Sequence, residues 1–112
     1  MNYIQWSDFE KIDMRVGTIV EVKEFPEARK AAFKVKVDLG PELGIKKSSA
    51  QLTVNYTKES LLGKQVICIV NFPPKQIGKF LSEILITGFP DEQQGVVLAQ
   101  PHIQVPNGSK LF

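Results

Sequence analysis

Residues 31–38 constrain the fold most strongly, because apolar and charged side chains alternate there from Phe33 onward. In an extended chain, successive side chains point to opposite faces, so this alternation separates one apolar face from one charged face. The apolar members are Phe33, Val35 and Val37, and the charged members are Lys34, Lys36 and Asp38. The segment is therefore predicted to be a strand with one face in the core and the other in water.

Other segments share this extended character. A first strand is predicted from Arg15 to just before Pro26, with an inward face at period two and Gly17 as the place for a bulge or bend. The residues of that face are Val16, Thr18, Val20 and Val22. Further strands are predicted at residues 45–52, 65–72 and 80–87, with a final short pair at 95–99 and 109–112.

Two short helices are predicted by their capping signals. Residues 7–10, Ser-Asp-Phe-Glu, match a capping box, and Thr57 is a second N-cap, with Tyr56 and Leu61 placed as a hydrophobic staple. Turns are expected at 39–44, and a proline-constrained loop at 73–79. This element order is that of an all-β, five-stranded OB-fold barrel with a short N-terminal helix, a short helix between strands three and four, and a C-terminal β extension.

The length of 112 residues, 43% of them hydrophobic, is enough for one core, so residues 1–112 are expected to form a single domain. The first residues lack the pattern of a secretory signal, and the longest apolar run is residues 66–70, far shorter than a membrane span. These features predict a cytoplasmic protein without direct membrane insertion.

No catalytic arrangement is recognisable. Cys68 is the only cysteine and lies in an apolar run, which favours a buried, unreactive thiol, and His102 is the only histidine. Ser48 and Ser49 have no nucleophile-elbow frame. We therefore expect no enzyme activity, no metal site and no cofactor.

The residues 13–19, Asp-Met-Arg-Val-Gly-Thr-Ile, resemble the opening strand of the tRNA-binding domain family. Four further blocks are similar to the CsaA branch of that family, in the same order along the chain. They are residues 25–30, 46–51, 70–78 and 105–108. Many relatives carry a lysine-methionine-arginine-glycine type of loop after the fourth strand, whereas this chain has Lys75-Gln76-Ile77-Gly78, which fits the CsaA branch.

The resemblance implies a non-catalytic homodimer that binds tRNA and has chaperone activity toward secretory protein precursors. Its implied partners are tRNA, unfolded secretory precursors and the export translocase ATPase. An alternative is a tRNA-binding or dimerisation module that serves as a scaffold for the translation apparatus, without a chaperone role. The sequence leaves these alternatives open.

The candidate RNA-binding residues lie on the polar side of the second and third strands and around the loop before the fifth strand. Lysines neutralise phosphates, while hydroxyl, amide and carboxylate groups bond sugars or base edges. The candidates are Lys34, Lys36, Lys46, Lys47, Ser49, Asn71, Lys75, Lys79, Ser82 and Glu83. For Lys34 and Lys36, binding and plain solvation are equally favoured, and Asn71 could instead fasten the Pro73-Pro74 loop.

Overall fold

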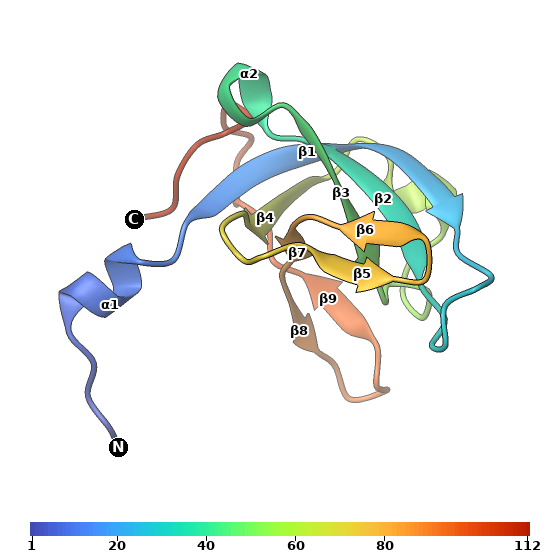
Figure 1. Ribbon diagram of the computed structural model, residues 1–112, viewed down its shortest axis with the longest axis horizontal. Helices are drawn as coiled ribbons and strands as arrows, with labels where there is room; N and C mark the ends of the chain where they lie inside the picture. Colours follow the sequence, from blue (N-terminus) through green and yellow to red (C-terminus); the bar gives the residue numbers. More distant parts are fainter.

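The longest strand, β1 (Met14–Glu24), is the centre of a five-stranded antiparallel sheet in the computed structural model, which describes residues 1–112 (Figure 1). The strand order is β3-β2-β1-β4-β7. The other members are β2 (Phe33–Asp38), β3 (Ile45–Ala50), β4 (Gln65–Ile69) and β7 (Leu85–Ile86). The short helices are α1 (Trp6–Glu10), α2 (Gly40–Leu43) and α3 (Lys58–Leu61).

The sheet curls until its two edges meet. The N–H of Glu83 donates to the carbonyl of Lys47 at 2.8 Å, and the N–H of Ser49 donates to Ser82 Oγ at 3.1 Å. These bonds join β3 to the last residue of β6 (Phe80–Ser82) and to Glu83, which lies between β6 and β7. The result is a nearly closed five-stranded barrel, which confirms the predicted OB-fold.

The core lies inside this barrel, and β2 supplies its centre. Val35 and Val37 are completely buried, as the alternation predicted, and Phe33 is nearly so. Val66 and Cys68 of β4 face them with no exposed surface, as does Leu61 of α3. The charged side of β2 consequently faces water.

A bulge in β1 corrects the predicted pattern of that strand. Ile19 pairs with Val37 and Glu21 pairs with Lys36, so Val20 is an extra residue between two consecutive partners. The bulge turns Ile19 inward, to 1% exposure, and leaves Val20 45% exposed. The prediction that Val20 faces the core was therefore wrong, and so was the placing of the bulge at Gly17.

A hairpin occupies the place of a predicted loop. Residues 73–79 are not a loop: β5 (Lys75–Ile77) pairs with β6, and the turn between them contains Gly78 at φ +59°. The proline-containing segment only leads into β5, so its missing N–H group breaks no ladder bond. The predicted strand 80–87 is consequently divided into β6 and β7.

The C-terminal strands pair with other partners than predicted. β9 (Val96–Leu98) pairs with β8 (Gly88–Pro90), not with residues 109–112. The C-terminal residues instead run beside β1, where Leu111 N–H donates to the Met14 carbonyl at 2.9 Å and Val16 N–H donates to the Ser109 carbonyl at 3.0 Å. Periodicity identified extended segments here but carried no information on which strand each one meets.

The two predicted helix starts had different outcomes. At α3, the prediction is confirmed, because Thr57 Oγ1 accepts from the Ser60 N–H at 3.1 Å. At α1, Ser7 lies inside the helix and Gln5 is the N-cap, its N–H donating to the Asp8 carboxylate at 2.9 Å. Helix α1 buries none of its residues and stands outside the barrel (Figure 1). No helix in the chain has both the length and the apolar character to span a membrane.

Candidate nucleic-acid interface

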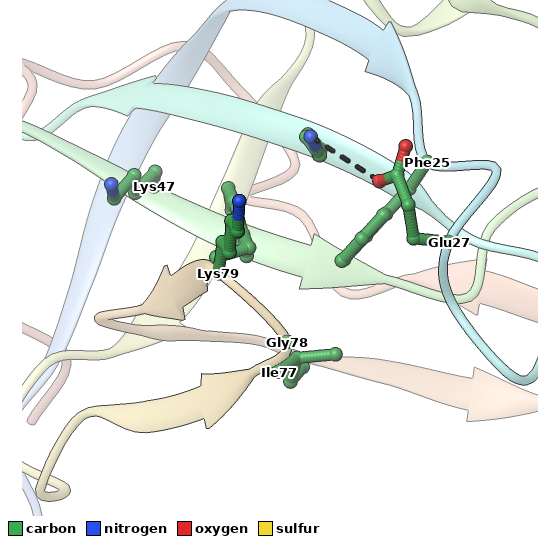
Figure 2. A pocket seen from close by; sticks show the side chains of 8 residues that line it. Phe25, Glu27, Lys47, Ile77, Gly78 and Lys79 are labelled. Atoms are coloured by element: carbon green, nitrogen blue, oxygen red, sulfur yellow. Dashed lines mark ion pairs between the residues drawn. The ribbon is translucent and has the colours of Figure 1, made fainter.

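A groove of about 600 Å³ opens between three parts of the barrel (Figure 2). The β1–β2 connection, the charged side of β2 and β3, and the turn of the β5–β6 hairpin each contribute to its wall. The lining residues are Phe25, Glu27, Lys34, Lys47, Ile77, Gly78, Lys79 and Phe80. We call this site the lysine groove. The β5–β6 hairpin lies between the fourth and fifth barrel strands, so these walls correspond to the strands and loops with which OB-folds bind oligonucleotides.

The sheet register sets lysines opposite one another beside the groove. Lys34 pairs directly with Lys23 across β1 and β2, and Lys36 pairs directly with Lys47 across β2 and β3. Like charges in directly opposed positions of a sheet repel. This repulsion lowers the stability of the free protein, and it is relieved when an anion binds between the ammonium groups.

Only part of this positive charge is neutralised within the chain. Lys34 pairs with Glu27 at 3.7 Å, and Lys36 pairs with Glu21 at 3.4 Å. Lys47 and Lys79 form no ion pair. A smaller cavity of about 220 Å³ shares Lys34 and Lys47 with the groove, and the two together carry five lysines and two glutamates. Figure 2 shows Lys47, Lys79 and Glu27 around the same space, with a dashed line marking the ion pair of Glu27.

Two phenylalanine rings underlie the lysines. The ring centroids of Phe25 and Phe80 are 5.3 Å apart, and Phe25 is buried while Phe80 is partly exposed. Lys34 Nζ lies 4.8 Å from the Phe25 centroid, and Lys47 Nζ lies 5.3 Å from that of Phe80. Cation–π attraction at these distances holds ammonium groups near the rings without neutralising them.

The structure brings together four of the predicted residues: Lys34, Lys36, Lys47 and Lys79. Other predicted residues line separate cavities. Lys75 and Ser49 line one of about 660 Å³, whose wall includes the half-exposed Phe72. Lys46 lines another of about 230 Å³. The candidate set is thus divided between several faces.

Ser82 and Glu83 have structural partners. Ser82 Oγ accepts the Ser49 N–H, and the Glu83 carboxylate accepts the Lys47 N–H at 3.2 Å. Both contacts contribute to the closure of the barrel at β3. Their position beside the candidate lysines follows from this closure, whereas a contact with RNA stays a prediction.

Asn71 fastens the N-terminal segment and not the Pro73-Pro74 loop. Its Nδ2 donates to the Lys11 carbonyl at 2.7 Å, and its Oδ1 accepts the Asp13 N–H at 3.0 Å. Both hydrogen-bonding ends of the amide are therefore used at the junction of α1 and β1. The expectation that it fastens the proline loop was wrong.

Sequence reasoning missed the aromatic and acidic residues of the groove. Phe25, Phe80 and Glu27 were not among the candidates, because their role depends on three segments meeting in space. The alternation on β2 indicated which lysines face outward, and Lys79 was placed with them, but residues 75–82 were not predicted to form the hairpin whose turn brings Phe80 to these lysines. A hairpin assignment for residues 75–82 could have supplied that signal.

Comparison with known proteins agrees with the barrel fold. Residues 14–110 match the family described as "Putative tRNA binding domain". The crystal structure of the chaperone CsaA of Bacillus anthracis is 44% identical, with a TM-score of 0.92, and covers 99% of this chain and 100% of its own. The CsaA chaperone of Picrophilus torridus is 47% identical, with a TM-score of 0.91, covering 98% and 100%.

Curated relatives include much longer proteins. Methionine–tRNA ligase of Pyrococcus horikoshii is 39% identical over 111 residues, which are 99% of this chain but 15% of the ligase. The chain thus spans about 15% of the length of the curated relative it matches. Because the family match covers residues 14–110 and the CsaA structures align over nearly the whole chain, this chain belongs to the tRNA-binding domain family and is similar to its CsaA members.

Proposed function

We propose that this protein is a non-catalytic, cytoplasmic tRNA-binding protein that holds folded tRNA against the lysine groove. The observation that carries the proposal is the meeting of three OB-fold ligand segments around lysines that the chain itself leaves partly unneutralised. Lysines attract phosphates through a sequence-independent term, so this surface suits recognition of RNA shape and backbone. The family match and the CsaA likeness support the choice of tRNA.

A second activity, binding of unfolded secretory precursors, is proposed for the cavity on the Phe72 side of the β5–β6 hairpin. This cavity measures about 660 Å³, and Phe72 beside it is 53% exposed. An extended apolar peptide would cover such exposed apolar side chains. The lysine groove, with its higher density of charge, suits an apolar peptide less well. The relatives' description as chaperones supports this choice.

Binding measurements on the purified protein separate these activities. Folded tRNA, heat-unfolded tRNA and an unfolded precursor peptide are each titrated at several salt concentrations. We expect a preference for folded tRNA that weakens steeply with salt, together with peptide binding that depends little on salt. Equal affinity for folded and unfolded tRNA would contradict recognition of tRNA shape, and no tRNA binding at low salt would refute the proposed function.

A further inference from the structure

The lysine groove contains more than a phosphate-binding surface requires. Phosphates need only cations, yet the groove also presents the partly exposed ring of Phe80, which rests on the buried ring of Phe25. Such a ring is a surface on which a flat, apolar ligand face can stack. The ammonium groups of Lys34 and Lys47 lie 5.7 and 5.3 Å from its centroid, so a stacked base takes their place over the ring. The volume of about 600 Å³ lies within the range of about 300–1,000 Å³ that small-ligand sites occupy.

We propose that this groove holds one unpaired nucleotide of the bound RNA, with its base stacked on Phe80 and its phosphate between Lys47 and Lys79. The inference rests on the proposed function and specifies which part of the RNA enters the groove. Lys47 Nζ is 5.3 Å from the Phe80 centroid, so a phosphate beside this ammonium group lies within one nucleotide of the ring. Ile77, at the start of the same turn, extends the apolar wall.

The nucleotide must be unpaired for a geometric reason. A base inside a duplex is covered on both faces by its neighbours, so an aromatic side chain can stack only on a base that is free of the helix. The groove volume of about 600 Å³ leaves room for such a base beside the β5–β6 turn, where Gly78 contributes no side chain to the wall.

The groove does not select among bases. Its lining contains no hydroxyl or amide side chain, and its single carboxylate, Glu27, is paired with Lys34. Reading a base edge requires hydrogen-bonding groups that fit that edge, whereas stacking tolerates every base. We therefore expect pentauridylate and pentacytidylate to bind with affinities within about threefold of each other.

The test is fluorescence anisotropy with labelled pentauridylate, with a short RNA duplex and uridine monophosphate as competitors, at several salt concentrations. Phe80→Leu removes the ring and keeps an apolar side chain. We expect it to weaken pentauridylate binding about tenfold, while the slope of log affinity against log salt stays the same, because no cation is lost. The matched control is Phe89→Leu, which removes an exposed ring on β8, outside the groove, and should change affinity less than twofold.

A second measurement does not depend on the folding of a variant. In the wild-type protein, the aromatic proton resonances of Phe80 should shift on titration with pentauridylate and saturate with the same dissociation constant as the anisotropy. Displacement by uridine monophosphate at a similar concentration would show that a free nucleotide, not an RNA segment, is the ligand, and would overturn the proposal. Tighter binding of the duplex than of pentauridylate would overturn it as well.

The outcomes distinguish this inference from the proposed function. If Phe80→Leu leaves pentauridylate and tRNA binding unchanged while substitution of the groove lysines weakens tRNA binding, the nucleotide subsite is refuted and the tRNA surface stands. If the lysine substitutions also leave tRNA binding unchanged, the proposed function itself fails.

Discussion

Glu27 is the residue whose charge opposes the proposed role of the groove. Its carboxylate lines the groove and pairs with Lys34 at 3.7 Å, although most of the glutamate side chain is exposed. An exposed ion pair of this kind contributes little to stability, on the order of 0–1 kcal/mol, so a phosphate can replace the carboxylate at little cost. Glu27 thus competes with the RNA phosphates for Lys34.

Replacement of Glu27 by glutamine should strengthen tRNA binding about two- to fivefold at low salt, because Lys34 becomes free for a phosphate. The matched control is Glu24→Gln, since Glu24 pairs with Lys58 at the same 3.7 Å but does not line the groove. Filter binding at two salt concentrations measures both variants. Equal gains in the two variants would indicate a general charge effect and contradict a local role for Glu27.

Cys68 lies in the core of the barrel with no exposed surface. Burial raises the pKa of its thiol to about 12 from an ordinary value of 9.0, because the thiolate would lose its hydration. The folded protein therefore keeps a proton that the unfolded chain releases at high pH. The stability that depends on this proton is intact below pH about 9 and is lost as the pH rises toward about 12.

Urea denaturation of the wild-type protein and of Cys68→Ala at pH 8 and pH 10.5 tests this linkage. Between these values the wild type should lose about 2 kcal/mol more in the free energy of unfolding than the variant, since the cost of the cavity in the variant does not depend on pH. A parallel decline in the two proteins would show that the pKa of the thiol is not raised in the folded state.

At the scale of elements, the sequence predicted best where one strand has one buried face. The strand β2 was predicted with its correct faces because its alternation is undisturbed, and α3 because Thr57 supplies a local capping signal. The errors lie where pairing is decided by contacts between distant segments: the β1 bulge, the β5–β6 hairpin and the partner of β9. The candidate site shared this limit: Lys34 and Lys47 lie on the neighbouring strands β2 and β3, whereas Lys79, Phe25 and Phe80 join them only through tertiary packing.

The β8–β9 hairpin is fastened to the barrel by Asn55 and Asp91. Asn55 Nδ2 donates to the Asp91 carboxylate at 2.7 Å and to the Val96 carbonyl at 3.0 Å. The bond from Asn55, followed by the N–H of Gly95, lowers the pKa of Asp91 below its ordinary value. The carboxylate form thus favours the fold above the ordinary pKa, and its contribution is lost as the pH falls through the lowered value.

In Asn55→Ala, the pKa of Asp91 should rise toward its ordinary value, and the amides of β8 and β9 should exchange hydrogen faster. The neighbouring Thr57→Ala serves as the control, because Thr57 caps α3 and has no bond to this hairpin. Carboxyl NMR titration and hydrogen exchange measure the two effects. If Thr57→Ala raised the pKa as much as Asn55→Ala, the local bond would not be its cause.

At the scale of the whole molecule, the two termini leave large apolar side chains in water on the same side of the barrel (Figure 1). Trp6 is 66% exposed, Phe112 is fully exposed, and α1 buries none of its residues. A second copy of the chain, related by two-fold symmetry, would cover such a surface with itself, and two-fold dimers are the commonest soluble assemblies. This surface lies on segments other than those that form the lysine groove.

We therefore predict a homodimer, for which light scattering at micromolar concentration should report twice the chain mass of 12.5 kDa. The variant Trp6→Ser should shift the equilibrium toward the monomer, whereas Phe89→Ser, which alters an exposed ring on β8, should leave the dimer intact. A wild-type protein that stays monomeric at this concentration would contradict the prediction.

The central claim, that the lysine groove binds tRNA, is tested most directly by comparing two double variants of equal charge. Lys47→Ala/Lys79→Ala removes the two groove lysines that have no ion pair, and Lys64→Ala/Lys110→Ala removes two lysines that do not line the groove. Circular dichroism verifies that both variants are folded, and salt-titrated filter binding with folded tRNA gives the affinities. We predict that the groove variant binds at least about tenfold more weakly and that its log affinity depends less steeply on log salt, by about 1.5–2 units, while the control changes less than about twofold. Equal losses in the two variants, or no loss in the groove variant, would contradict the claim.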